Sequence, residues 1–233
     1  MLDLFGQALL DFYTQNNPQP LLTETSISEE DEMDVAYLFR SYQNMPPLEQ
    51  KAMQLAKGKV LDVGAGAGCH ALYLQQKGME VTALDQSAYA IEACRLQKIQ
   101  NCIQSSVLDY KSETLYDTIL LLMNGTGIFG KLNQTATYLQ KLKSLLSPGG
   151  QILIDSSDLI YMFDEDEDGG RWIPDTGYYV ELEFTLHYKG QKEQFPWLYL
   201  DYNTLQNAAL ANGFHCELIA EGKNYDYLAR LTV

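Results

Sequence analysis

The sequence is poor in positive charge. Its 233 residues include 16 lysines and arginines against 31 aspartates and glutamates, which gives a formal net charge of −15 at pH 7. A surface of this sign repels phosphate backbones and anionic lipid headgroups, so we expect neither nucleic acid nor a membrane as a partner. Charged residues make up only 20% of the chain and hydrophobic residues 46%, which predicts a packed core and excludes global disorder.

Long apolar runs are missing as well. The longest uninterrupted one, Ile119 to Met123, is far too short to cross a bilayer. Asp3 stands where a signal peptide would carry basic residues, and Asp11 breaks the apolar run that follows. We therefore predict no signal peptide and a cytoplasmic location.

Cysteine is scarce, and no two cysteines form a CxxC pair. This argues against a zinc site and a disulfide framework and predicts reduced thiols. The acidic run from Asp164 to Asp168 lacks the spacing of a calcium-binding loop, so we predict no metal. We expect a solvated loop that can act as a lid. The four cysteines are Cys69, Cys94, Cys102 and Cys216.

Strand-like and helix-like segments alternate from Lys59 onwards. The pattern implies right-handed crossovers, and hence an α/β fold with a doubly wound parallel sheet. Apolar segments such as 119–123 fit a sheet that is covered on both faces. The predicted strands are 60–63, 79–84, 102–105, 116–123 and 151–155, and the predicted helices are 67–77, 87–98 and 132–146.

Both ends of this alternating region carry other elements. Before it, residues 1–57 are predicted to form a helical extension, with helices through Leu2–Phe12, after Ser28 and after Pro46. The rest, 58–233, is predicted to be one domain with a β-hairpin inserted at about 157–201. A helix at 203–212 and two strands at 215–220 and 227–233 end the chain.

A glycine-rich turn follows the first buried strand of the alternating region. The segment reads Val60-Leu61-Asp62-Val63-Gly64-Ala65-Gly66-Ala67-Gly68 and runs into a helix. Glycines let the backbone approach a ligand closely, and the helix N-terminus presents free N–H groups. The segment is therefore a candidate cradle for a nucleotide-like cofactor.

Polar residues follow the next three strands. Asp85 ends the second strand, Leu108-Asp109 follows the third, and Asn124 follows the fourth. Ligands of open α/β sheets lie beyond the carboxyl ends of the strands, where a carboxylate can accept both hydrogen bonds of a ribose diol. The alternative for Asp85 alone is a solvated acid that closes a strand.

These motifs resemble those of class I S-adenosylmethionine-dependent methyltransferases. In the resemblance, Val60–Gly68 is the first motif, Asp85 holds the ribose hydroxyls and Asp109 contacts the adenine amino group. Tyr116-Asp117 and Leu146–Gly150 match later motifs. The resemblance implies a seven-stranded sheet with an antiparallel last strand, and S-adenosylmethionine as cofactor. The cofactor-binding residues it implies are Asp62, Gly64, Ala65, Gly66, Gly68, Asp85, Gln86, Leu108, Asp109 and Asn124.

Neither an Asn/Asp-Pro-Pro-Tyr/Phe tetrad nor a paired cysteine follows the fourth strand, which argues against methylation of DNA bases. We therefore expect a small-molecule acceptor, with a protein as the open alternative, and in-line methyl transfer. One alternative is a protein that binds the cofactor without catalysis, and another is a transferase that uses a modified adenosylmethionine. A dinucleotide-dependent oxidoreductase is less favoured, because Cys69 replaces the third glycine of the GxGxxG fingerprint.

A few side chains outside the motifs are further candidates. Arg40 can hold the carboxylate at the methionine end of the cofactor, or it can form a surface salt bridge. His70 either lines the cofactor pocket or faces solvent. Weak candidates for catalysis are His187, Asp158 and Tyr161, although His187 fits a structural histidine on a strand and Asp158 fits a helix cap.

Overall fold

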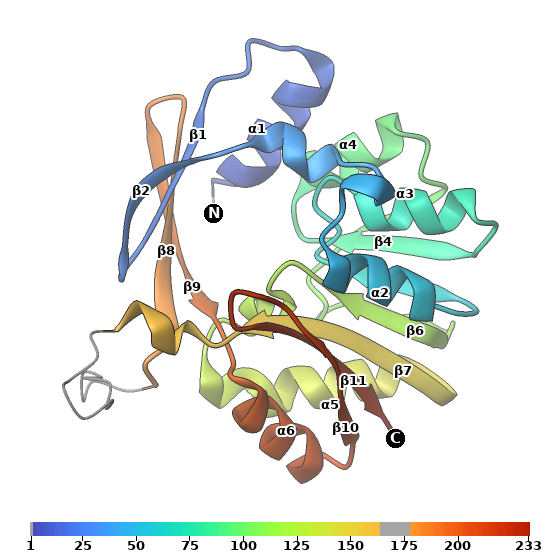
Figure 1. Ribbon diagram of the computed structural model, residues 1–233. Coiled ribbons are helices and arrows are strands. Elements are labelled where there is room, and N and C mark those ends of the chain that lie inside the picture. The colour runs from blue at the N-terminus through green and yellow to red at the C-terminus, as the bar shows by residue number, and fades with distance from the viewer. Residues whose placement is uncertain (1, 164–177) are drawn as a thin grey trace.

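The computed structural model describes residues 2–163 and 178–233. Two sheets organise this part of the chain, and the larger is a seven-stranded sheet of order β10-β11-β7-β6-β3-β4-β5 (Figure 1). All its strands run parallel except β11, which is antiparallel to β7 and to β10. The strands are β3 (Val60–Val63), β4 (Val81–Asp85), β5 (Asn101–Gln104), β6 (Tyr116–Leu121), β7 (Leu146–Ser157), β10 (His215–Glu221) and β11 (Asp226–Thr232).

Helices cover both faces of this sheet, as the apolar strands predict. One face packs against α2 (Pro47–Leu55), α3 (Cys69–Gln76) and α4 (Ala88–Leu96), and the other against α5 (Thr135–Leu145) and α6 (Tyr202–Ala211) (Figure 1). Ser87 caps α4 by accepting a hydrogen bond from the Ala90 N–H. The predicted doubly wound fold with an antiparallel last strand is confirmed.

The second predicted N-terminal helix is wrong. The residues after Ser28 form a strand, β2 (Ser28–Met33), paired with β1 (Leu21–Thr25). In turn β1 pairs with β8 (Glu181–Tyr188) of the inserted hairpin, whose other strand is β9 (Gln191–Leu198). The result is a four-stranded antiparallel sheet of order β2-β1-β8-β9. The other partner of β1, strand β8, lies far away in sequence. Without it, the acids after Ser28 fit the first turn of a helix.

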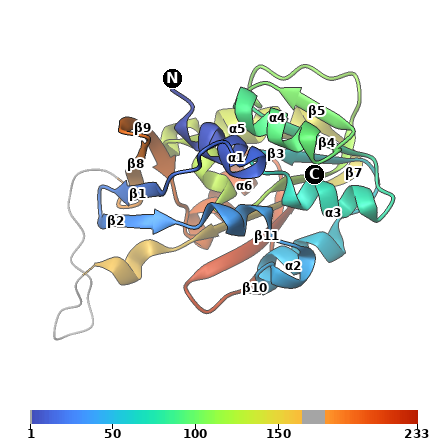
Figure 2. The same ribbon diagram turned by 90° about the horizontal axis from the view of Figure 1, so that it is seen from above.

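The four-stranded sheet stands beside the carboxyl ends of β6 and β7 (Figures 1 and 2). A 3-10 helix, Gly125–Phe129, follows β6 and joins the two sheets. Its Thr126 hydroxyl lies 2.7 Å from Ser156 Oγ of β7 and donates to the Leu198 carbonyl of β9. The joint is closely packed, since a Cβ on Gly127 would lie 1.9 Å from Trp197 Cε2.

The predicted first helix is confirmed as α1 (Leu4–Thr14), and it bridges both sheets. Its N-terminus is held by Glu193 of β9, whose carboxylate accepts hydrogen bonds from the N–H groups of Leu2, Asp3 and Leu4. Asp11 near its other end pairs with Lys189 at 2.6 Å. Between its two ends, α1 packs against α4 of the core.

Two further predictions concern the chain outside the core. Among residues 2–163 and 178–233, no helix has the length and apolarity that crossing a membrane requires. The acidic run from Asp164 to Asp168 lies outside the described residues, so its role as a lid stays a prediction.

Candidate functional site

The glycine-rich turn lies at the carboxyl end of β3. The N–H groups of Gly64 and Ala65 donate to the Leu84 carbonyl of β4, which fixes the turn against the neighbouring strand. Gly68 has φ +79°, and a Cβ there would lie 2.5 Å from Ile99 Cδ1. Gly66, at φ +53°, has no atom closer than 3.8 Å to such a Cβ. Packing therefore demands glycine at 68, whereas at 66 the backbone conformation demands it.

Asp85 faces this turn from the end of β4. Its Oδ2 accepts from the Gly66 N–H and its Oδ1 from the Ser87 N–H, both at 2.8 Å. Burial raises the pKa of Asp85, the two N–H donors lower it, and nearby Asp3 raises it further. The carboxylate thus ties the glycine turn to the start of α4 and keeps lone pairs for a ligand. Gln86, the next residue, is exposed.

Asp62 lies within β3 and is only 2% exposed. Its Oδ2 has no hydrogen-bond partner within the part of the chain that the structure describes. Burial raises the pKa of Asp62, and the charge of His70 opposes this. A buried carboxylate oxygen without a donor is costly, so this atom fits a cationic ligand group.

His70 is buried in the first turn of α3, so it does not face solvent. Its Nε2 lies 2.8 Å from Glu49 Oε2. Burial alone would lower the pKa of His70, but Cys69, Glu49 and Asp62 together raise it well above its usual value. The contact with Glu49 therefore favours a protonated His70 next to the glycine turn.

Arg40 reaches the same glutamate from the segment that follows β2. Its Nη2 and Nε donate to Glu49 Oε2 at 2.5 and 3.2 Å, and its Nη1 donates to the Tyr37 carbonyl. Its guanidinium also lies over the Tyr37 ring, 4.3 Å from the centroid. The Arg40 side chain is only 2% exposed, so the ion pair expected at the surface is in fact buried.

Leu108 and Asp109 lie in a turn beyond the end of β5. Asp109 is exposed, and its Oδ2 accepts a hydrogen bond from Ser106 Oγ at 2.7 Å. Ser105 lies closer to the strand and donates its N–H to the Asp85 carbonyl. A role of Asp109 toward adenine stays a prediction.

Asn124 lies directly beyond β6 in a left-handed conformation, with φ 57°. Met123 before it is also left-handed, at φ 65°. Asp155 at the end of β7 holds this strained pair, because its carboxylate accepts from the Met123 and Gly125 N–H groups at 3.0 Å each. Burial raises the pKa of Asp155 to about 6. The Ser157 hydroxyl then donates to Asn124 Oδ1 at 3.2 Å and orients the amide.

A cavity of about 200 Å³, here called the inter-sheet cavity, lies between the four-stranded sheet and the carboxyl ends of β6 and β7. It contains Asn124 and Tyr161, so it joins a predicted cofactor residue to a predicted catalytic one. Burial raises the pKa of Tyr199 to about 12, so this phenol is neutral at pH 7. The lining residues are Thr25, Ser28, Asn124, Ser157, Leu159, Tyr161, Met162, Leu182 and Tyr199.

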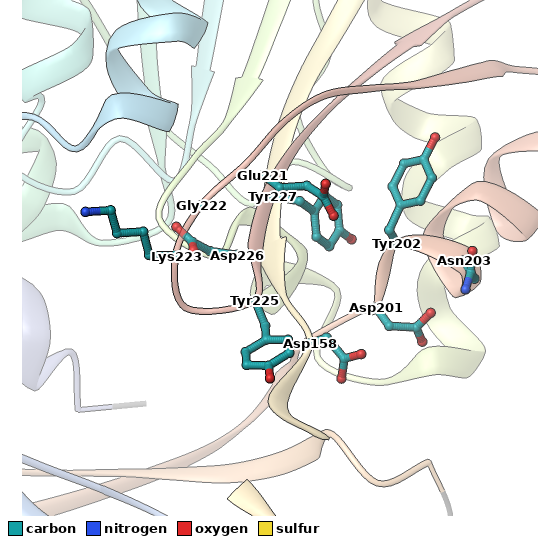
Figure 3. A pocket seen from close by; sticks show the side chains of 10 residues that line it. All are labelled: Asp158, Asp201, Tyr202, Asn203, Glu221, Gly222, Lys223, Tyr225, Asp226 and Tyr227. Carbon is teal, nitrogen blue, oxygen red and sulfur yellow. The ribbon is translucent and has the colours of Figure 1, made fainter. Parts of the chain in front are cut away.

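A larger cavity of about 500 Å³ lies where the β10–β11 turn meets the start of α6 (Figure 3). Asp158 lies at its edge next to Tyr225, and the Tyr161 ring stacks on the Tyr225 ring at 5.3 Å. The Asp158 carboxylate accepts from the Ile160 N–H and from the Tyr179 hydroxyl. Asp158 therefore caps the short helix Leu159–Met162, as the alternative interpretation predicts.

His187 lies far along β8 in the four-stranded sheet. Its Nε2 lies 3.4 Å from Glu24 and 3.8 Å from Glu30. It lines neither of the two cavities. The structural interpretation of His187 is therefore the better one.

Glu49 has no sequence signal, because it lies in α2, a helix whose sequence gives no reason to place it near the glycine turn. Asp155 has one: the sequence places it at the end of the fifth predicted strand, 151–155, where substrate contacts are expected. In the structure it lies near the end of β7.

Known proteins with similar sequences and structures contain the same arrangement of strands and helices. Residues 60–150 match the family described as "Methyltransferase domain". A crystal structure of a SAM-dependent methyltransferase from Bacteroides fragilis, in complex with S-adenosyl-L-homocysteine, is 47% identical. The alignment covers 99% of this chain and 94% of that one, with a TM-score of 0.91.

The curated relatives are more distant, and each matches about half of this chain. Carboxy-S-adenosyl-L-methionine synthase of Photobacterium profundum is 27% identical over 117 residues, 47% of this chain and 47% of that protein. Ubiquinone biosynthesis O-methyltransferase of Pectobacterium atrosepticum is 27% identical over 119 residues, 47% of this chain and 46% of that protein. The match thus spans about half the length of these curated relatives. DesVI of Streptomyces venezuelae, 16% identical with a TM-score of 0.63, covers 87% of this chain and 99% of its own and shares the fold.

Proposed function

This chain belongs to the S-adenosylmethionine-dependent methyltransferases, and we propose that it transfers the cofactor's methyl group to a small-molecule acceptor held in the inter-sheet cavity. The observation that carries the proposal is the position of Asn124. This residue follows β6 among the predicted cofactor residues and also lines the inter-sheet cavity of about 200 Å³. Cofactor and acceptor would therefore meet at Asn124.

The residues present fit the cofactor at two points. The unpaired Oδ2 of Asp62 suits the α-ammonium group of a methionine end. The Asp85 carboxylate, already fixed by two N–H groups, suits a ribose diol. His70, whose charge acts on Asp62, and Arg40, which pairs with the same Glu49 as His70, add buried positive charge that would suit the carboxylate of the same methionine end.

The protein's part in such a reaction is to bind and orient. When bound, the cofactor supplies an electrophilic methyl group on a sulfonium sulfur. The walls of the inter-sheet cavity would hold the acceptor's nucleophilic atom in line with that methyl group at near-contact distance. Asp155 would keep Asn124 in place between the two ligands, since it holds the backbone on both sides of that residue.

Label transfer tests the proposal. The protein is incubated with S-adenosylmethionine labelled in the methyl group and with a panel of small amines, phenols and carboxylic acids, or with protein and RNA. We expect label in a small molecule together with an equal amount of S-adenosylhomocysteine. Label in macromolecules alone would contradict the proposal, and cofactor binding without any transfer would favour a non-catalytic binding protein.

A variant pair locates the acceptor. Tyr161→Ala should lower kcat/KM for the acceptor about tenfold while affinity for S-adenosylhomocysteine stays the same, because Tyr161 lines the inter-sheet cavity and is not among the predicted cofactor residues. Leu210→Ala removes a side chain on α6 that is 56% exposed and serves as the control. Equal loss in both variants would contradict the assignment of the cavity.

A further inference from the structure

Glu49 lies where three segments of the chain converge. It belongs to α2, Arg40 belongs to the segment that links β2 to α2, and His70 begins α3 directly after the glycine turn. In Figures 1 and 2 the linking segment crosses from the four-stranded sheet to α2 and α3 of the core. A contact at Glu49 therefore connects the four-stranded sheet to the glycine turn.

Among the described residues, the polar contacts of Glu49 fall on one carboxylate oxygen. Its Oε2 accepts from Arg40 Nη2 at 2.5 Å and Nε at 3.2 Å and lies 2.8 Å from His70 Nε2. The three side chains are 2%, 6% and 7% exposed for Arg40, Glu49 and His70. One carboxylate thus holds two buried cations side by side, which would otherwise repel each other.

The charges around this cluster match an amino acid zwitterion. Asp62 adds a second buried acid whose Oδ2 is unpaired among the described residues, and the charge of His70 acts on it. Without Glu49, the cations would repel each other and the imidazole would lose its proton more easily. The carboxylate of Glu49 is what keeps the second cation charged and in place.

We propose that Glu49 is a positioning residue for the cofactor, which holds Arg40 and His70 as a pair of cations against the carboxylate of the methionine end. The inference rests on the proposed function, because it assumes that the cofactor binds at the glycine turn. It also gives the linking segment a role, since Arg40 can complete the pair only when that segment packs on α2 and α3.

The electrostatics of the cluster agree with this role. Burial alone would raise the pKa of Glu49, but the hydrogen bonds and charges of His70 and Arg40 lower it. Cys69 and Asp62 also raise the pKa of His70. The contacts within the cluster therefore favour the ionised form of Glu49 and the protonated form of His70.

The test measures the titration of His70 in the ligand-free protein and the affinity of the protein for S-adenosylhomocysteine. The imidazole C–H signals of the three histidines are followed by NMR against pH, and His70 is assigned with a His70→Asn variant. Affinity for S-adenosylhomocysteine is measured by calorimetry. In Glu49→Gln we expect His70 to titrate at lower pH than in the wild type and the ligand to bind about tenfold more weakly.

Two further variants separate this role from a structural one. Glu49→Asp keeps the charge and should restore part of both properties. Glu80→Gln changes an exposed glutamate paired with Lys59 at 3.6 Å and should change neither. A folded Glu49→Gln protein that binds S-adenosylhomocysteine within twofold of the wild type would overturn the proposal.

If Glu49→Gln fails to fold, the His70 signal of the wild-type protein tests the proposal instead. We expect the His70 signal to stay that of the protonated form through neutral pH and to shift when S-adenosylhomocysteine is added. An ordinary titration of His70, or no shift on saturation with the ligand, would overturn the proposal. A wild type that binds no S-adenosylhomocysteine would refute the proposed function itself, whereas the ligand-free titration would still show whether the cluster exists.

Discussion

One pairing in the seven-stranded sheet and one in the four-stranded sheet differ in how far apart the paired strands lie in sequence. In the larger sheet β3 pairs with β4, and Val60 stands opposite Val81. In the smaller sheet β1 pairs with β8, and Leu22 stands opposite His187. The cofactor motifs lie on strands that pair with near neighbours in the sequence, such as β3 and β4. The inter-sheet cavity forms only when β1 pairs with the distant strand β8. A family can therefore be recognised from local sequence where an acceptor cannot.

The largest effect is expected at the joint between the two sheets. In Gly127→Ala the new Cβ would lie 1.9 Å from Trp197 Cε2, so the joint must open. We expect a loss of about 3 kcal/mol in the free energy of unfolding, measured in urea. Adding Trp197→Phe should recover part of it. An unchanged unfolding midpoint would mean that the two sheets are not packed as described.

The next effect concerns the core alone. Asp85→Ala removes the carboxylate that holds the Gly66 and Ser87 N–H groups and faces the ribose position. We expect S-adenosylhomocysteine to bind at least about tenfold more weakly in calorimetry. Glu92→Ala, an exposed change on α4, is the control. Unchanged affinity in a folded Asp85→Ala protein would refute the role of Asp85.

A smaller effect is expected where α1 meets the four-stranded sheet. Glu193→Gln removes the negative charge that accepts three N–H groups at the start of α1. We expect a loss of about 1–2 kcal/mol in stability and faster hydrogen exchange at the amides of residues 2–4. Glu183→Gln, an exposed change on β8, should leave both unchanged. Exchange that is equally slow in Glu193→Gln would show that α1 does not depend on β9.

The smallest effect is a change in pH dependence. Because burial raises the pKa of Asp155 to about 6, the folded state holds this proton more tightly than the unfolded state. The resulting stability is present below about pH 4 and is lost as pH rises through 6. Asp155→Asn should remove that pH dependence, measured by urea unfolding between pH 4 and 7. An identical slope in both proteins would contradict a buried, titrating Asp155.

The sequence was sufficient for the core because its signals are local. The buried strand Val60–Val63, the glycines after it and the Ser87 cap each depend on neighbours within a few residues. It was insufficient for β1, whose partner β8 lies in the insert, and for β2, which pairs with β1. For the same reason Arg40 could be named as a candidate, but its partner Glu49 could not, since that contact exists only once α2 and α3 have packed.

Calorimetric titration of the purified wild-type protein with S-adenosylmethionine, S-adenosylhomocysteine and NADH tests the central claim most directly. The glycine turn, Asp85 and the unpaired oxygen of Asp62 predict micromolar binding of the two adenosyl ligands and no binding of NADH. Binding of NADH without either adenosyl ligand would contradict the account.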